Sequence, residues 1–274
     1  MHTVTIIVDK KFYSVVTKQL EDMDIKVLDY AKKELDDNLI KYTSETSNSD
    51  FIYDIAELLT NCIINVYEFF LLNKIISKDY INFNVQEKKK IMHVAKEIID
   101  GNDSVVDKVF FIKRKNYIYK RLVDYLSKNE VIRLEGFIIF RLKDYKSDLE
   151  LILEKAVDVY LTDKEYNEFI NLLKYFIEVQ ESRIDVVHLT IYANGDFKLC
   201  DKFERDISYL YIDDMREELL NSKLTKEDIL LGALITISPQ KIILNRKCDG
   251  KISKEIFNTI NSVFTDRISI HDPN

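Results

Sequence analysis

The 274-residue sequence has few of the residues that interrupt regular structure or build compact binding motifs. It contains five glycines, two prolines and no tryptophan. Because glycine and proline supply most tight turns, their scarcity favours long helices with few flexible linkers, and it argues against a glycine-rich phosphate-binding loop. The three cysteines, Cys62, Cys200 and Cys248, are far apart and form no CxxC pair. This usage fits a reducing compartment and argues against a disulfide framework or a zinc knuckle.

The common signatures of catalysis are also missing, because the sequence has no Walker loop, GxGxxG, HExxH or GxSxG motif. We therefore expect no cofactor and no metal, and the balance favours a protein that is not an enzyme. The N-terminus has no basic leader and too short an apolar run for a secretory signal. The most apolar stretches, 55–76 and 229–243, are interrupted by charges or by Pro239. We expect no membrane insertion and a cytoplasmic location.

The residues that are present are those of a globular protein with an acidic balance. Hydrophobic residues make up 46% of the chain, which is enough to bury a core, and the formal net charge is −7. An acidic protein as a whole repels nucleic acid and anionic lipid. Binding to either would therefore require a local basic patch.

The hydrophobic periodicity predicts an α+β fold in three regions. Residues 1–46 form a small β-α-β-β unit, with a strand over Thr3–Val8, a helix, and two strands around the turn-forming Asp36-Asp37-Asn38. Residues 47–181 are helical, with breaks near 79–84, 101–103 and 128–129. Residues 182–274 form an α+β region that packs on the helices, either as a separate domain or as one continuous domain with them.

Within the helical region the sequence predicts an antiparallel helical hairpin. Apolar residues recur at heptad spacing over 130–161, as in a helix that packs against another helix. Thr162-Asp163-Lys164-Glu165 has the pattern of a capping box and so predicts the start of a second helix. That second helix has its own apolar stripe, formed by Phe169, Ile170, Leu172, Leu173, Phe176 and Ile177.

The C-terminal third is expected to be a β-hairpin followed by α-β-α-β. Two strands, 185–192 and 197–202, flank Asn194-Gly195, a strong hairpin signal. A capping box at Thr225–Asp228 begins a helix that Pro239 ends. A strand over 241–245, a helix over 251–264 and a strand over 267–270 follow.

His188 lies in the first strand of this hairpin and raises the question of acid/base chemistry. A two-residue turn would place it opposite Asp201, but the apolar pattern fits a three-residue loop better, and that register separates the two side chains. A metal site built from His188, Cys200, Cys248 and His271 matches no known ligand spacing. We favour a structural role for His188.

A basic and aromatic segment offers a candidate nucleic-acid interface. Its six cations, with no acidic residue among them, are Lys108, Lys113, Arg114, Lys115, Lys120 and Arg121. Basic residues interleaved with phenylalanine and tyrosine are typical of single-stranded nucleic-acid binding. The alternative, which we favour in so acidic a protein, is a solvated helix face whose aromatic residues enter the core.

Arg141 lies in an almost wholly apolar stretch, Glu135–Tyr145. A buried charge needs a partner, so we expect Arg141 to be at least partly buried and paired with a carboxylate such as Asp144 or with a backbone carbonyl. It either pins a helix to the C-terminal sheet or belongs to a binding site. The candidate binding residues are Glu135, Arg141, Lys143, Tyr145, Tyr175 and His188.

Four segments, 135–145 (EGFIIFRLKDY), 164–180 (KEYNEFINLLKYFIEVQ), Val187-His188 and 233–245 (ALITISPQKIILN), together with 266–270, resemble the YtxC-like family. The resemblance is good from about residue 130 onwards. It implies a cytoplasmic protein associated with sporulation in endospore-forming bacteria, and it transfers no catalytic residue. Our first hypothesis is an interaction or regulatory protein that binds another protein. The alternatives are a nucleic-acid-binding protein and, least favoured, an enzyme using Arg141 and His188. The oligomeric state is left open.

Overall fold

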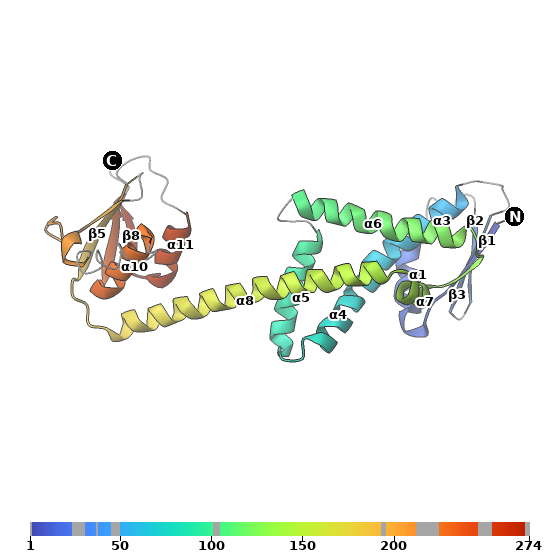
Figure 1. Cartoon of the computed structure of the whole chain (residues 1–274), viewed down its shortest axis with the longest axis horizontal. Coiled ribbons are helices and arrows are strands. Elements are labelled where there is room, and N and C mark those ends of the chain that lie inside the picture. The colour runs from blue at the N-terminus through green and yellow to red at the C-terminus, as the bar shows by residue number, and fades with distance from the viewer. Residues whose placement is uncertain are drawn as a thin grey trace. The chain divides into compact units, whose positions relative to one another are not determined.

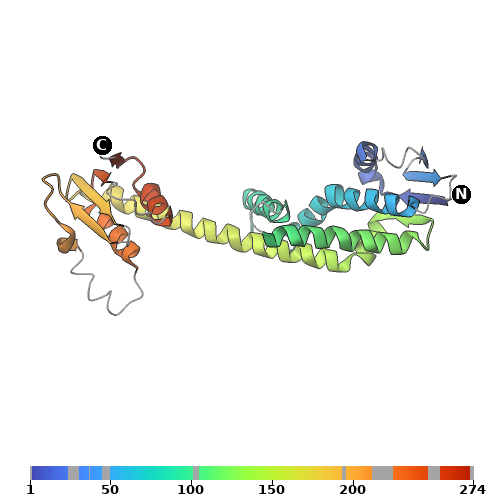
Figure 2. The same cartoon turned by 90° about the horizontal axis from the view of Figure 1, so that it is seen from above.

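The structure, a computed structural model, describes residues 2–23, 31–36, 38–44, 50–100, 105–192, 196–211, 225–245 and 254–271. The chain forms two compact units, Met1–Thr162 and Asp163–Asn274, called the first and second unit below. Figures 1 and 2 show the helices and strands of each unit in two views. Each unit contains a four-stranded sheet and helices, which confirms the α+β class.

The sheet of the first unit contains the expected β-α-β-β unit. Its elements are β1 (His2–Ile7), α1 (Lys10–Met23), β2 (Ala31–Asp36) and β3 (Leu39–Ser44). A further strand, β4 (Val131–Arg133), pairs in parallel with β1 and completes the order β2-β3-β1-β4. We did not expect β4, because three residues are too few to show a strand period. Residues 45–49, at the expected boundary, lie outside the described residues.

The helices of the first unit follow the expected breaks near 79–84 and 128–129, and the expected break at 101–103 lies outside the described residues. A continuous helix is formed by α3 (Phe51–Cys62), the π-helical turn η1 (Ile63–Tyr67) and α4 (Glu68–Asp79), and it is followed by α5 (Val85–Asp100) and α6 (Val105–Leu126). The helix over Phe51–Asp79 is long and apolar enough to cross a membrane, but 56% of its most apolar stretch is buried in the protein. It is thus consistent with the core helix of a soluble protein.

The prediction of an antiparallel helical hairpin is wrong. After β4, helix α7 (Leu134–Arg141) ends at a break at Leu142, and α8 runs without interruption over Lys143–Val179. Thr162 caps nothing, because its hydroxyl donates to the Asp158 carbonyl one turn back (2.9 Å). No glycine or proline occurs between residues 143 and 179 to end the helix. Two stripes on one continuous helix cannot pack against each other.

The second unit has the expected β-hairpin plus α-β-α-β. Its elements after α8 are β5 (Val186–Ile191), β6 (Phe197–Cys200), α10 (Lys226–Ile237), β7 (Lys241–Asn245), α11 (Lys254–Val263) and β8 (Ile268–His271). The capping box at Thr225 and Asp228 is present. The sheet has the order β6-β5-β7-β8. Residues 193–195 lie outside the described residues, but Tyr192 pairs with Asp196, as a three-residue loop requires.

One face of the second sheet packs on the helices. Val187 and Leu189 of β5 are buried in a core that also contains Ile170, Leu173 and Ile177 of α8. Because side chains alternate along a strand, His188 and Thr190 lie on the opposite face of the sheet. Residues of α10 and α11 complete the same core, among them Leu234 and Phe264.

Candidate functional site

A buried carboxylate follows the π-helical turn in the long helix of the first unit. The backbone N–H of Glu68 donates to the Ile63 carbonyl, five residues back, which is the π-helical pattern. The extra residue of such a turn changes which side chains face the interior, and π turns inside α-helices often occur at functional sites. Glu68 is only 6% exposed.

Two side chains from other helices meet this carboxylate. The Arg114 Nε of α6 lies 3.2 Å from Glu68 Oε2, and the Tyr145 hydroxyl of α8 donates to the same oxygen at 2.7 Å. Both partners are as buried as Glu68. A charge inside an apolar core requires such partners, because desolvation would otherwise destabilise it strongly. We call Glu68, Arg114 and Tyr145 the buried cluster, which joins α4, α6 and α8.

The buried surroundings shift the pKa values of the cluster. Burial raises the pKa of Glu68 above its ordinary value, while the Arg114 guanidinium and the Tyr145 hydroxyl act in the opposite direction. Burial, together with the neighbouring Glu68 carboxylate, raises the pKa of Tyr145 well above its ordinary value. The Tyr145 hydroxyl therefore keeps its proton and remains a hydrogen-bond donor to Glu68.

A second group of polar contacts near the π-helical turn is formed by Glu135, one of the candidate binding residues. Its Oε1 accepts hydrogen bonds from the Tyr67 hydroxyl (2.5 Å) and from the Asp9 backbone N–H (3.1 Å). Burial, and then the contact with Glu135, raise the pKa of Tyr67. Burial and the Glu135 charge also raise the pKa of the Cys62 thiol to about 12. Glu135 thus ties the start of α7 to the long helix and to the segment before α1.

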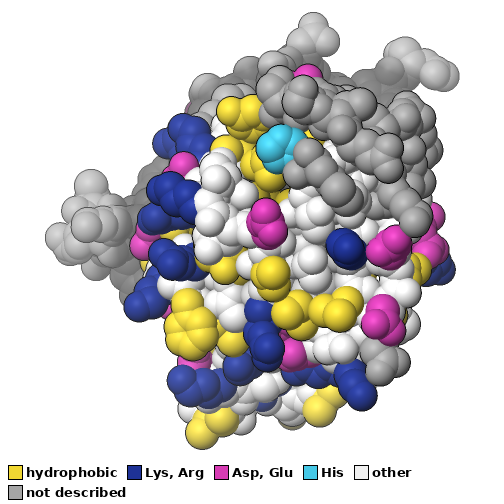
Figure 3. All heavy atoms as spheres, turned by 90° about the vertical axis from the view of Figure 1, so that its right-hand side faces the viewer, with side chains coloured by type: hydrophobic (Ala, Val, Ile, Leu, Met, Phe, Trp, Pro, Cys, Tyr) yellow, Lys and Arg dark blue, Asp and Glu magenta, His cyan; other side chains and the backbone are white. Residues whose placement is uncertain are grey.

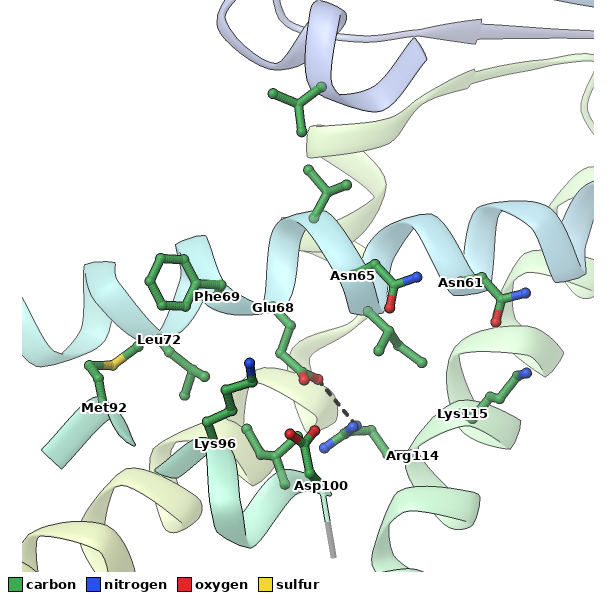
Figure 4. Close-up of a pocket in the computed structure, with 14 residues that line it drawn as sticks. Asn61, Asn65, Glu68, Phe69, Leu72, Met92, Lys96, Asp100, Arg114 and Lys115 are labelled. Carbon is green, nitrogen blue, oxygen red and sulfur yellow. Dashed lines mark ion pairs between the residues drawn. The ribbon is translucent and has the colours of Figure 1, made fainter. Parts of the chain in front are cut away.

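A cavity of about 680 Å³ lies beside the ion pair of Glu68 and Arg114, and Figure 4 shows its labelled lining residues. Its walls come from the long helix, α5 and α6, together with Val15 of α1. The polar lining residues are Asn61, Asn65, Glu68, Lys96, Asp100, Arg114 and Lys115. The volume is within the range of small-molecule sites, and convergent polar groups on an otherwise apolar wall are typical of them.

Tyr145 also lines a smaller cavity, of about 230 Å³, on the 135–145 segment. The lining includes Ile138, Ile139 and Leu142 from that segment and three lysines, Lys74, Lys78 and Lys146. The segment that carries the family resemblance therefore lines this cavity and supplies Tyr145 to the buried cluster. Tyr145 itself is fully buried, so it is no part of an exposed contact surface.

The expectation that Arg141 is buried and paired is wrong. Arg141 is the last residue of α7 and is exposed, with its guanidinium 5.9 Å from the ring centroid of Tyr125. Asp144, its expected partner, instead accepts a hydrogen bond from the Tyr117 hydroxyl (3.0 Å) and lies 3.9 Å from Arg121. The break at Leu142 turns this end of the helix to solvent. Lys143 is exposed as well.

The basic segment lies on α6, but its cations do not share one surface. Arg114 points into the core, and Lys115 is half-buried at the cavity. Lys113, Lys120 and Arg121 are exposed, and nothing is described of the Lys108 side chain. Figure 3 shows one end of the first unit, where lysine and arginine side chains lie along the edge among smaller apolar groups.

His188 and Tyr175 belong to the second unit. His188 pairs with Cys200 across the hairpin, so it does not face Asp201. Asp201 is held by its own turn, where it accepts from the Phe203 and Arg205 backbone N–H groups. Among the described residues, no three His, Cys, Asp or Glu side chains are arranged to hold a metal ion. Tyr175 is exposed on α8.

Tyr175 belongs to a row of large exposed side chains on α8, which we call the α8 stripe. Its members are Phe169, Leu172, Tyr175, Phe176 and Val179, each between 49% and 60% exposed. Ile170, Leu173 and Ile177, from the same part of the helix, are buried in the core of the second unit. The absence of the expected hairpin explains the stripe, because the predicted covering helix is part of α8 itself.

These features describe an α+β protein with a polar buried cluster beside a ligand-sized cavity. The chain belongs to the YtxC-like family, whose model matches residues 53–269. It is 28% identical over 200 residues to the "Uncharacterized protein YtxC" of Bacillus subtilis (strain 168), with 72% of this chain and 68% of that protein covered. No solved structure matches significantly. The matched range includes Glu68, Arg114 and Tyr145.

Sequence reasoning missed Glu68 and mistook the role of Arg114. One signal was available for Glu68, because it is one of only two carboxylates, with Glu57, in the apolar stretch 55–76. Such a residue is expected to have a buried partner. Arg114 gave no comparable signal, since its neighbours Lys113 and Lys115 are also cations and the α6 period alone does not single it out.

Proposed function

We propose that this protein is a non-enzymatic interaction protein of the cytoplasm that acts during sporulation, and that it binds a partner protein through the α8 stripe. The association with sporulation rests on the family resemblance. The observation that carries the proposal is the stripe itself, five large apolar side chains about half exposed within eleven residues of one helix. Exposed apolar groups that adjoin each other are typical of protein interaction sites.

The spacing of the stripe supports a helical partner. Phe169, Leu172, Phe176 and Val179 follow each other at intervals of three, four and three residues. This is the spacing of the seam between two packed helices, in which side chains of one helix insert between those of the other. The aromatic members are of the residue types that dominate binding energy at interfaces.

The charges beside the stripe indicate the chemistry of that helix. Glu165 and Glu168 are exposed at its N-terminal end, and Glu178 is exposed beside Val179. Acidic residues around an apolar seam favour a partner with basic residues in the facing positions. We therefore expect an amphipathic helix of another protein, with an apolar face flanked by lysine or arginine.

The proposal is tested by affinity capture from sporulating cells with a pair of variants. Phe169→Ser combined with Phe176→Ser removes the largest members of the stripe, whereas Asn167→Ser changes an exposed polar position on the same helix. A specific partner should be captured by the wild type and by Asn167→Ser and lost with the double variant. Equal recovery by all three proteins would contradict the proposal, and so would a captured partner whose binding segment lacks an apolar helical face.

The nucleic-acid alternative has less support in the structure. Arg114 is engaged with Glu68 in the interior, and Arg121 lies 3.9 Å from Asp144, which offsets its charge. Salt-dependent binding to single-stranded nucleic acid that is abolished by charge reversal at Lys113 and Lys120 would revive it.

A further inference from the structure

The cavity beside Glu68 and Arg114 is built by residues that the interaction surface on α8 does not involve. Asn61, Asn65, Glu68, Phe69 and Leu72 follow each other along the long helix. At 1.5 Å per residue these positions extend over about 16 Å, so the cavity is elongated along the helix axis. The π-helical turn between Ile63 and Tyr67 lies at the middle of this row.

The two ends of the cavity differ in chemistry, as Figure 4 shows. Phe69, Leu72 and Met92 lie towards one end. Asn61, Asn65 and Lys115 lie towards the other end, whereas the Arg114 guanidinium points to Glu68 in the middle. Lys96 and Asp100 of α5 project between the two ends. The occupant that fits both ends is a molecule with one apolar and one polar part.

The charges at the polar end favour an anion. The two amides offer N–H donors, and Lys115 adds a cation at the same end. The Glu68 carboxylate does not reverse this balance, because its Oε2 already accepts from Tyr145 and lies against Arg114. The lining as a whole carries three cations, Lys96, Arg114 and Lys115, against two carboxylates, Glu68 and Asp100. Lysine and amide donors around a half-enclosed space are suited to a carboxylate or a phosphate group.

We propose that this cavity binds a small amphipathic anion, with its acidic group between Asn61, Asn65 and Lys115 and its apolar chain against Phe69, Leu72 and Met92. The buried residues Glu68 and Arg114 have a structural role in such a site. Their pairing fixes the wall in place and leaves the lysines and amides to bind the ligand. The site lies in the first unit, so this proposal can be tested independently of the α8 stripe.

The test is isothermal titration of the full chain with four eight-carbon probes, each below its micelle concentration. Octanoate and octyl phosphate carry the two anionic head groups, octanol is neutral and octylamine is cationic. We expect saturable binding of one molecule per chain for at least one of the anions, and the tighter anion identifies the head group. Weaker binding, or none, is expected for octanol and octylamine.

Variants locate the bound probe. Lys115→Gln removes one charge-assisted hydrogen bond and should weaken binding of the anion about tenfold. Asn65→Leu changes an exposed lining residue and should also weaken it, which gives a second test if Lys115→Gln disturbs the fold. Lys90→Gln, an exposed position of α5 outside the lining, is the matched control and should bind as the wild type does. Phe169→Ser with Phe176→Ser should also leave the affinity unchanged.

The proposal is overturned if neither anion binds with saturation, or if octanol or octylamine binds as tightly as the anions. It is equally overturned if Lys115→Gln and Asn65→Leu, both folded by circular dichroism, bind the probe with wild-type affinity. Loss of binding in the α8 double variant would place the probe on the stripe and would contradict the cavity as its site.

Discussion

In the first unit charged side chains enter the core, whereas in the second unit large apolar side chains remain on the surface of α8. Glu68 and Arg114 are almost fully buried, and they pair with each other within a mainly apolar core. Among the described residues of the second unit, the buried polar side chains are Asp201 and Ser238. Asp201 holds its own turn, and the Ser238 hydroxyl donates to the Ile177 carbonyl of α8.

Buried charges in the first unit and exposed apolar side chains in the second unit are suited to different kinds of ligand. Buried charges beside a cavity can hold a small molecule in a fixed environment, because the paired groups do not reorganise when the ligand enters. Exposed apolar side chains on a helix are suited to a protein partner, because their burial in a complex releases apolar surface from water. On these two proposals the units bind different ligands, and we expect that a variant in one unit leaves binding by the other unchanged.

The largest effect is expected from Arg114→Ala in the first unit. The substitution leaves the buried Glu68 carboxylate without its cation, so the free energy of unfolding should fall by about 3–5 kcal/mol. Urea denaturation followed by circular dichroism measures it. Arg121→Ala, an exposed cation on the same helix, is the control and should change the free energy by less than about 0.5 kcal/mol.

A matched double variant sharpens this test. Arg114→Met with Glu68→Leu removes both charges and keeps similar volume, so most of the lost stability should return. If Arg114→Ala costs less than about 1 kcal/mol, or if the double variant is as unstable as the single one, the ion pair is not what holds α4 and α6 together.

Tyr145→Phe should have a smaller effect in the same cluster. It removes the hydroxyl that donates to Glu68 Oε2 and should lower the free energy of unfolding by about 1–3 kcal/mol. Tyr175→Phe, which alters an exposed tyrosine of the same helix, should be close to neutral. Comparable losses for the two variants would show that the hydroxyl of Tyr145 contributes nothing particular.

The smallest effect is expected from alanine substitution of two threonines that have similar sequence patterns. Thr225 caps α10, so Thr225→Ala should cost about 1 kcal/mol of unfolding free energy. Thr162 lies inside α8 and bonds back to Asp158, so Thr162→Ala should be neutral or stabilise by a few tenths of a kcal/mol. A clear loss of stability in Thr162→Ala would support the capping box and the hairpin that the structure replaces with one helix.

These threonines also show how far the sequence predicts the fold. Both start the pattern Thr-x-x-Asp/Glu, but only Thr225 has the extended backbone of an N-cap, whereas Thr162 is preceded by a full helical stripe that continues beyond it. The strand and helix periods predicted β1, α1, β2, β3 and the order of the elements described in the second unit. They did not predict β4, because its pairing with β1 depends on contacts between residues about 126 apart in the chain.

The candidate site was harder to predict from the sequence than the fold. Its central contacts join residues 68, 114 and 145, which no local pattern relates. Arg141 was expected to be the buried arginine because its neighbours are apolar, yet it ends a helix, and Ile139 and Phe140 beside it are exposed as well. The α8 stripe was visible as an apolar pattern, but its exposure follows only from the continuous helix.

The central claim, that the protein binds a helical partner through the α8 stripe, is tested most directly by photo-crosslinking in sporulating cells. A photoreactive amino acid is placed at Leu172 in one strain and at Asn167, about 140° around the helix, in another. We expect a discrete crosslinked protein from position 172 and none from position 167, with the crosslinked peptide in an amphipathic helical segment of the partner. Crosslinks of equal yield from both positions, or none from position 172, would contradict the claim.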